Sequence, residues 1–400
     1  MLDPFDFEDL RPYTDQEVPA VIERLLQEPM LYEVMEWVYP GLDQADIQEM
    51  FEDVHTVDDF QQNISGPVFK VVTQMTTSGL SFTNMDVLDY GTPYLFLSNH
   101  RDIILDSALL NVSLMEKGHQ TTQIAIGNNL LRNPLIYDLV RINKNFIVHR
   151  DINPREMLAY SQRLSNYIRR TLLEDKTSIW IAHKEGRSKD GDDRTATGLL
   201  KMLGMSGEEG LVDSLGGLNI VPMVVSYEFD PCDILKTNEL LNVKLNGAHE
   251  KMPGEDFKSM MLGVTGHKGG VNIAVGTPIN DRVAAWAGDG PRNEQLRNLT
   301  AAIDREMHLH YKLWPSNYVA YDLLHGTREY RGMYTSVQKI TFRNYLRQRM
   351  LKLMIARKKL GHERAGFQKQ VREILLQMYA NPVINYREST SLSEVASEAK

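Results

Sequence analysis

Two patterns of apolar and polar positions follow each other along the chain. Within residues 15–86, apolar residues such as Leu31, Met35 and Val38 recur three and four positions apart, which predicts amphipathic helices. From about residue 90, short apolar runs alternate with stretches long enough for helices. The predicted strands are residues 94–97, 123–126, 146–148, 178–182, 220–225 and 271–275. This alternation predicts an α/β fold with a mostly parallel sheet covered by helices.

Beyond residue 280 the pattern predicts helices at residues 294–313 and 336–379 and no further strand. We expect four regions. They are an acidic helical N-terminal region (1–80), an α/β domain (81–285), a helical C-terminal region (286–386) and a tail (387–400), rich in Ser and Glu, that we predict to be disordered.

Composition and charge narrow the class of protein. The chain has 400 residues, of which 42% are hydrophobic and 24% charged, as in ordinary globular proteins. A formal net charge of -9 argues against nucleic-acid binding. The single cysteine, Cys232, excludes an intramolecular disulfide. The acidic N-terminus does not resemble a signal peptide, and no apolar run approaches the ~20 residues of a spanning helix. We therefore expect a cytoplasmic protein that meets a membrane, if at all, at its surface.

The basic part of the chain has two open interpretations. Within residues 340–379, Leu346, Met350, Leu351 and Met354 lie at helical spacing among many Lys and Arg residues. Such a basic amphipathic helix can lie on an anionic bilayer. Alternatively, the helix packs on the catalytic domain with a solvated basic face. In that case the acidic N-terminal helices could pack against it.

The most informative stretch is residues 95–110, LFLSNHRDIILDSALL. A strand runs into Asn99 and His100 and a helix follows, which is where open α/β sheets bind ligands. A carboxylate from Asp102 or Asp106 could orient His100 as a general base. That base could take the proton of an alcohol that attacks an acyl ester or thioester. The alternative is a helix start capped by Asn99 or Asp102, with an inert histidine.

Two further strands end in basic residues. The run RINKNFIVHRD ends in Arg150, and an arginine at a strand end can bind a phosphate through two hydrogen bonds. In SIWIAHKEGRSKDG, Lys184 and Arg187 could bind a phosphate, while Gly186 would let the backbone approach a ligand. The alternatives are a surface salt bridge and a solvated loop. A fourth stretch, LNIVPMVVSYE, is in isolation a core strand ending in Ser226, Tyr227 and Glu228.

The order and spacing of these stretches resemble the glycerophospholipid acyltransferase family, which includes glycerol-3-phosphate and 1-acylglycerol-3-phosphate (lysophosphatidate) acyltransferases. SNHRDIILD, NFIVHR, EGRS and VPMVVSYE are similar to its four motifs, and VNIAVGTPI to its closing strand, over residues 81–281. The resemblance implies catalysis by His100 with Asp106 or Asp102. It also implies substrate-binding residues, namely Asn99, Arg101, Arg150, Lys184, Glu185, Gly186, Arg187 and Ser188.

Two departures from the family pattern suggest a divergent bacterial-type branch. The family places four residues between the His and the Asp, whereas five separate His100 from Asp106. One residue rotates a helical side chain by about 100°. Asp106 can therefore reach His100 only if the turn holds the extra residue, and Asp102 stays an alternative. The third motif also lacks the residue that the family places between Glu-Gly and Arg.

The resemblance implies direct acyl transfer from an acyl thioester, either acyl-CoA or acyl-ACP, with no bound cofactor or metal. The acceptor would be a hydroxyl of glycerol-3-phosphate or lysophosphatidate in phospholipid synthesis, and the enzyme would lie peripherally on the inner face of the cell membrane. One alternative is a metal-dependent hydrolase using His100, Asp102 and Asp106. The other is a non-catalytic lipid- or phosphate-binding protein of the same fold. We interpret His149, His183, His249 and His267 as structural or solvent-facing.

Overall fold

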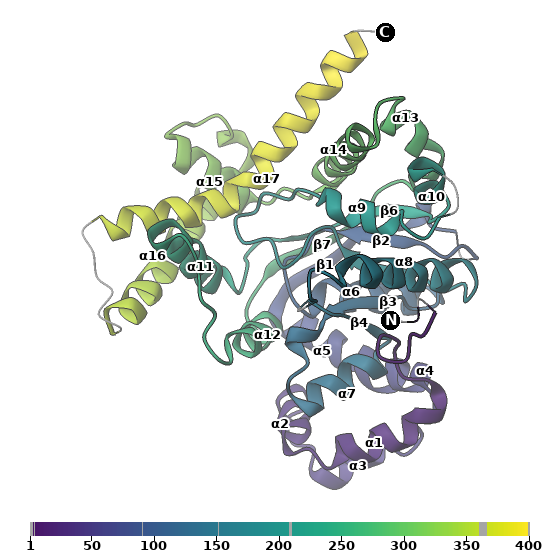
Figure 1. Ribbon diagram of the computed structural model, residues 1–400. Coiled ribbons are helices and arrows are strands. Elements are labelled where there is room, and N and C mark those ends of the chain that lie inside the picture. Colours follow the sequence, from purple (N-terminus) through teal and green to yellow (C-terminus); the bar gives the residue numbers. More distant parts are fainter. Residues whose placement is uncertain are drawn as a thin grey trace.

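The computed structural model describes residues 3, 5–89, 91–150, 152–207, 210–359 and 366–398. A seven-stranded sheet with the strand order β1-β7-β6-β2-β5-β3-β4 forms its centre (Figure 1). The paired strands are parallel except for β6 and β7. The strands are β1 (Thr77–Thr83), β2 (Leu95–Ser98), β3 (Gln123–Gly127), β4 (Asn145–Val148), β5 (Ile179–Ala182), β6 (Ile220–Tyr227) and β7 (Gly269–Val275). The predicted α/β fold is confirmed.

The predicted strands match β2 to β7, whereas β1 lies in a part of the chain that we predicted to be helical. Its sequence, TSGLSFT, holds no continuous apolar run, and none of its residues is fully buried. As an edge strand that pairs with β7, β1 is stabilised by long-range backbone hydrogen bonds rather than by burial. Such pairing leaves no local signal in the sequence.

Helices cover both faces of the sheet. The helices are α1 (Val18–Leu26), α2 (Pro29–Val38), α3 (Gln44–Phe51), α4 (Val57–Asp59), α5 (Gly66–Thr76), α6 (Leu105–Glu116), α7 (Pro134–Ile142), α8 (Met157–Leu173), α9 (Thr197–Leu203), α10 (Leu211–Gly216), α11 (Asp233–Asn246), α12 (Glu255–Thr265), α13 (Val283–Ala287), α14 (Arg292–His310), α15 (Pro315–His325), α16 (Ser336–Lys359) and α17 (Phe367–Glu398). Five 3-10 turns (η1, Asp15–Glu17; η3, Met85–Val87; η4, Asn128–Leu130; η5, Asn280–Arg282; η6, Arg331–Met333) and a π-helical stretch (η2, Phe60–Ser65) complete the described elements.

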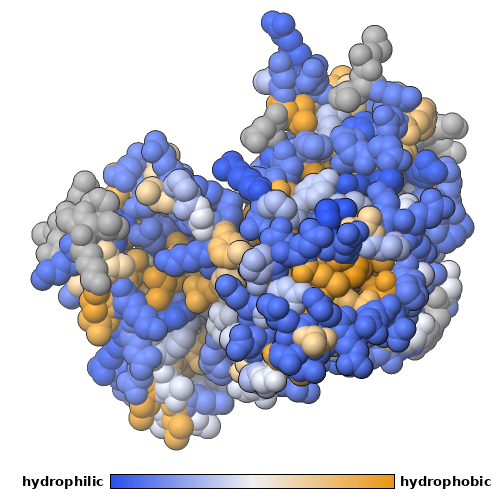
Figure 2. Space-filling model, turned by 90° about the horizontal axis from the view of Figure 1, so that it is seen from below, coloured by the Kyte–Doolittle hydropathy of each residue, from blue (hydrophilic) through white to orange (hydrophobic). Residues whose placement is uncertain are grey.

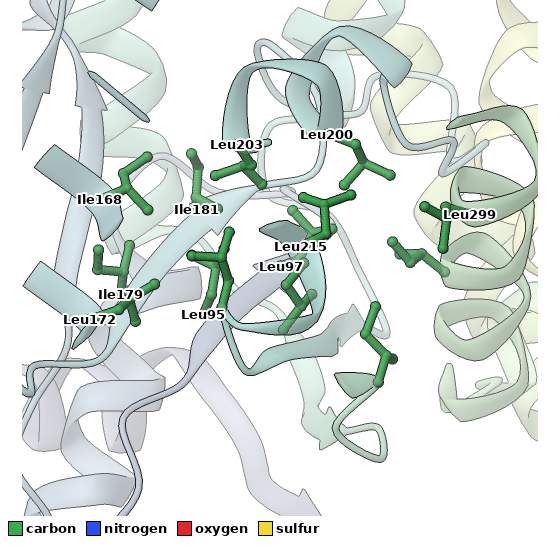
Figure 3. Packing of buried hydrophobic residues seen from close by; sticks show 14 of the residues in the cluster. Leu95, Leu97, Ile168, Leu172, Ile179, Ile181, Leu200, Leu203, Leu215 and Leu299 are labelled. Carbon is green, nitrogen blue, oxygen red and sulfur yellow. The ribbon is translucent and has the colours of Figure 1, made fainter. Parts of the chain in front are cut away.

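The central strands are buried on both faces because successive side chains alternate in direction. Leu95 and Leu97 of β2 join one apolar cluster, while Phe96 between them joins a second cluster on the other face. Figure 3 shows how strands β2 and β5 share the first cluster with helices α8, α9, α10 and α14. Its labelled residues are Leu95, Leu97, Ile168, Leu172, Ile179, Ile181, Leu200, Leu203, Leu215 and Leu299. A sheet buried in this way positions its strand ends rigidly.

The sequence left open whether the N-terminal helices pack against the basic C-terminal segment. Among the described residues they pack on α7 instead. They form their own apolar cluster with Leu135 and Ile142 of α7. Arg24 of α1 also forms an ion pair with Asp138 of α7, with 2.8 Å between the nitrogen and the oxygen. In Figure 1 this group lies below the sheet. Helices α1 to α3 thus lie on the α7 side of the molecule, whereas α5 packs against β1 at the other edge of the sheet.

The C-terminal region departs from two predictions. The helix predicted over residues 336–379 is two helices, α16 and α17, and residues 360–365 between them lie outside the described residues. The tail that we predicted to be disordered from residue 387 instead continues α17 to Glu398. Helix α17 packs against α15, α11 and α14 and so crosses the molecule (Figure 1). Its apolar residues, such as Val371 and Leu375, are buried in a third cluster.

Candidate active site

The first motif forms the turn between β2 and α6, and it encloses a carboxylate. The Nδ1 atom of His100 lies 2.9 Å from Oδ2 of Asp106. The backbone N–H groups of Arg101 and Asp102 donate to the same oxygen at 2.6 Å and 2.9 Å. Asp106 is fully buried. The residue that is extra relative to the family pattern lies in the turn before α6 begins at Leu105, so Asp106 still reaches His100.

The second oxygen of Asp106 is held by a residue that we had interpreted only as part of a core strand. The hydroxyl of Tyr227, the last residue of β6, donates to Oδ1 of Asp106 at 2.9 Å. Burial, and then the Asp106 charge, raise the pKa of Tyr227 well above its usual value, so it stays a donor. The edge of Trp180 meets the His100 ring with 5.4 Å between ring centroids. The imidazole is therefore fixed, with Nε2 left to act on a substrate.

Asp102 has a different role. Its carboxylate accepts from the backbone N–H groups of Ile104 and Leu105, each at 2.9 Å, at the start of α6. Burial, and then the nearby Asp106 carboxylate, raise the pKa of Asp102. A Cβ atom on Gly263 of α12 would overlap this carboxylate. Of the two carboxylates that the sequence left open, the structure pairs Asp106 with His100 and uses Asp102 as a helix cap.

Asn99 and Arg101, which the resemblance assigned to substrate binding, are buried among protein partners. Asn99 donates to Oδ2 of Asp193 at 3.0 Å and bonds the backbone of Val225 in both directions. Arg101 forms an ion pair with Asp193 at 2.6 Å. Burial opposes these charges, but their attraction lowers the pKa of Asp193 and raises that of Arg101. The two side chains fasten the turn to the loop after β5, and we leave them out of the proposed substrate site.

The third motif lies directly against the first. The backbone N–H of Ser188 donates to the carbonyl oxygen of His100 at 2.7 Å. Gly186 has a φ of +74°, a conformation that favours glycine, so the loop can turn back to His100. Lys184 does not face outward; its Nζ donates to the carbonyl oxygen of Asp192 in the same loop, at 3.0 Å. The loop thereby positions the backbone of His100.

The second motif places a guanidinium beside this loop. Arg150 follows β4 and lies across Gly127 at the end of β3, where a Cβ atom would overlap the Arg150 side chain. Its NH1 atom is 3.6 Å from Oε1 of Glu185, whose side chain is 78% exposed. Arg187 is partly buried, and its NH1 has no hydrogen-bond partner among the described residues. Of these two arginines, Arg150 has the partly exposed guanidinium, whereas the NH1 atom of Arg187 is buried.

The other histidines have structural surroundings. His183 is fully buried, and burial lowers its pKa to about 3, which keeps the ring neutral. His149 pairs with Asp9, with 3.3 Å between Nε2 and the carboxylate. His249 and His267 lie away from the turn, against Glu255 and Phe229.

Within the part of the chain that the structure describes, one group of side chains could hold a metal ion. Glu239, His249 and Glu255 place ligand atoms within 4.8 Å of one another. Glu239 already pairs with Lys189, and His249 lies 2.9 Å from Glu255. His100, Asp102 and Asp106 are not such a group among these described residues.

The comparisons agree with the motifs. Residues 79–226 match the family model of acyltransferases. This segment is an acyltransferase domain, in agreement with the motifs. Among solved structures, the chain is similar to the 1-acyl-sn-glycerophosphate (LPA) acyltransferase PlsC of Thermotoga maritima. The identity is 10% and the TM-score 0.38, over 72% of this chain and 93% of that chain. No curated protein matches the chain.

None of the described helices combines the length and the apolar character that crossing a bilayer requires.

Proposed function

We propose that this acyltransferase moves a fatty acyl group from an acyl thioester, acyl-CoA or acyl-ACP, to a hydroxyl of glycerol-3-phosphate or lysophosphatidate. We further propose that it works in phospholipid synthesis on the inner face of the cell membrane. The observation that carries the proposal is the His100–Asp106 pair at the carboxyl end of β2. Arg187 and Arg150 follow the parallel strands β5 and β4 of the same sheet.

The geometry supports direct transfer without an acyl-enzyme. Asp106 accepts the Nδ1 proton of His100, so Nε2 can accept a proton from the acceptor hydroxyl. As the hydroxyl oxygen attacks the thioester carbonyl, a C–O bond forms and His100 becomes a cation beside Asp106. Collapse of the tetrahedral intermediate breaks the C–S bond, and the departing thiolate takes the proton from His100. The carboxylate of Asp106 stabilises the imidazolium between the two proton transfers.

The acceptor's phosphate is proposed to lie between Arg150 and Arg187. A guanidinium can bind a phosphate through two hydrogen bonds. Arg187 follows β5, which pairs with β2, and Arg150 follows β4, which lies beyond β5 and β3 in the same parallel part of the sheet. Glu185, now 3.6 Å from Arg150, would then move or contact the acceptor hydroxyl. Lys184, Gly186 and Ser188 shape the loop that holds this side of the site.

Release of thiol from a long-chain acyl-CoA or acyl-ACP tests the proposal. The full chain, the His100→Gln variant and the control His55→Gln, which alters an exposed histidine of the N-terminal region, are compared with each acceptor. We expect acceptor-dependent release that falls by about 10²–10⁴-fold in His100→Gln and is unchanged in His55→Gln. Release that persists in His100→Gln, or no release with either acceptor and either carrier, would contradict the proposal. The non-catalytic alternative predicts binding of the phosphorylated acceptor without release.

A further inference from the structure

Helix α16 has a buried face that fixes its position. Phe342, Leu346 and Leu353 are buried in the third apolar cluster, together with residues of α15 and α17. On the same side, Nε of Arg349 lies 2.6 Å from Oδ1 of Asp233, which is fully buried at the start of α11. One face of α16 therefore packs on the rest of the protein, as the second of the two interpretations of the sequence expects.

The opposite face of α16 exposes large apolar side chains. Val337, Ile340, Leu351 and Ile355 are 72%, 58%, 59% and 48% exposed. Positions 337, 340, 344, 348, 351 and 355 follow one another at intervals of three and four, so they lie on one line along the helix. At about 100° per residue, this line lies opposite Phe342, Leu346 and Leu353. The line, which we call the stripe, has a pair of exposed apolar side chains toward each end and the polar Asn344 and Gln348 between the two pairs, and packing does not use it.

The charge around this stripe has one sign. Between Ser336 and Lys359 the sequence contains no Asp or Glu, although the whole chain has a net charge of -9. Arg343, Arg347, Lys352 and Lys358 are exposed beside the stripe. In Figure 2, apolar residues lie among polar ones on the lobe at the left, where α16 and α17 lie in Figure 1.

A line of apolar side chains flanked by cations fits the surface of an anionic bilayer. The apolar groups can enter the boundary between headgroups and acyl chains, and each cation near the surface attracts lipid phosphates. We propose that this face of α16 docks the protein on an anionic lipid bilayer. The proposal deepens the proposed function, because a lysophosphatidate acceptor would lie in such a bilayer.

Buried contacts hold the docking face in a fixed orientation to the active site. Asp233, the partner of Arg349, follows closely on Asp230, and Asp230 pairs with the buried ammonium of Lys236. Lys236 also donates to the carbonyl oxygen of Arg101, next to His100, at 2.8 Å. A protein that lies on the membrane through α16 would therefore present its catalytic turn at a defined height and tilt.

The test is sedimentation of the full chain with vesicles, which needs neither acyl donor nor acceptor. Vesicles of phosphatidylcholine alone are compared with vesicles that also contain phosphatidylglycerol. We expect binding to the second kind that weakens as salt rises. The double variant Leu351→Gln/Ile355→Gln should lose about tenfold or more in affinity. Removal of one cation by Arg347→Gln should cost about fivefold.

Leu158→Gln is the matched control, because Leu158 is also apolar and 71% exposed but lies on α8. It should bind as the unaltered protein does, and thermal unfolding should be unchanged in all variants. Thiol release with soluble glycerol-3-phosphate reports on the proposed function separately. Absence of binding to phosphatidylglycerol vesicles, or equal binding by the double variant, would overturn the docking proposal. A dimer that the double variant abolishes, without vesicle binding, would assign the stripe to a second copy instead.

Discussion

The catalytic turn and the proposed acceptor side of the site are built on different principles. Asp106 is fully buried and accepts hydrogen bonds from His100, Tyr227 and two backbone N–H groups, at 2.6–2.9 Å. Arg150 follows β4, which β5 and β3 separate from β2; its side chain is 32% exposed, and its carboxylate partner Glu185 is 3.6 Å away. A general base gains from being fixed before the substrate arrives, whereas a binding arginine must be able to leave its partner for the ligand.

The largest effect should come from exchanging the two carboxylates of the turn for amides. Asp106→Asn removes the charge that orients His100, and we expect kcat to fall by about 10²–10⁴-fold. In Asp102→Asn the amide oxygen can still cap α6. Acceptor-dependent thiol release should therefore change by about threefold or less, because a cap does not act on the substrate. Equal losses in both variants would contradict the division of roles.

The next largest effect should come from a substitution on α12 that crowds the catalytic turn. Gly263→Ala adds a methyl group where the Asp102 carboxylate lies, so α12 or the turn must move. We expect kcat to fall by about 10–100-fold, with an unfolding free energy lower by ~1–3 kcal/mol. Gly198→Ala in α9 is the control, since its Cβ would meet nothing within 4 Å. Denaturant unfolding and thiol release measure the two effects, and an active Gly263→Ala would show that the turn tolerates displacement.

A substitution on the exposed acceptor side of the site should weaken substrate binding and leave the chemical step unchanged. Arg150→Gln removes a proposed phosphate ligand, and we expect the KM for the acceptor to rise about tenfold while kcat changes little. The unfolding free energy should stay within about 0.5 kcal/mol, because the side chain is exposed. Arg155→Gln, an exposed arginine in the same segment, serves as the control. A fall in kcat at constant KM would mean that Arg150 takes part in the chemical step. That result would contradict the contrast between the catalytic turn and the acceptor side of the site.

The smallest expected effect concerns Tyr227, which acts through Asp106. Tyr227→Phe removes one hydrogen bond to the carboxylate and keeps the ring, so kcat should fall by only about three- to tenfold. Without this donor one oxygen of the buried carboxylate loses its partner, so His100 is oriented less firmly. Thiol release measures kcat, and denaturant unfolding measures stability. A merely structural role would lower stability and leave kcat unchanged.

The sequence predicted the elements that carry local signals and left open those that depend on distant partners. Apolar runs located β2 to β7, while β1 was missed because its stabilisation comes from β7. The motif marked His100, but only the geometry of the turn could decide between Asp102 and Asp106. Tyr227 became part of the site through the pairing of β6 with β2, which no spacing along the chain reveals. Arg101 was assigned to substrate binding because its buried partner, Asp193, lies far along the sequence and leaves no local signal.

The edge position of β1 has a consequence for synthesis of the chain. β1 is made before every other strand, yet its partner residues lie far downstream; Ser81 and Asn272, which bond each other, are 191 residues apart. At the usual rate of translation this corresponds to a delay of about 10–40 s. During that time β1 would be open to pairing with other nascent chains, and so would the neighbouring edge of β6 once β6 has been made. A fragment limited to the family-matched residues 79–226 would keep both edges exposed for its whole lifetime.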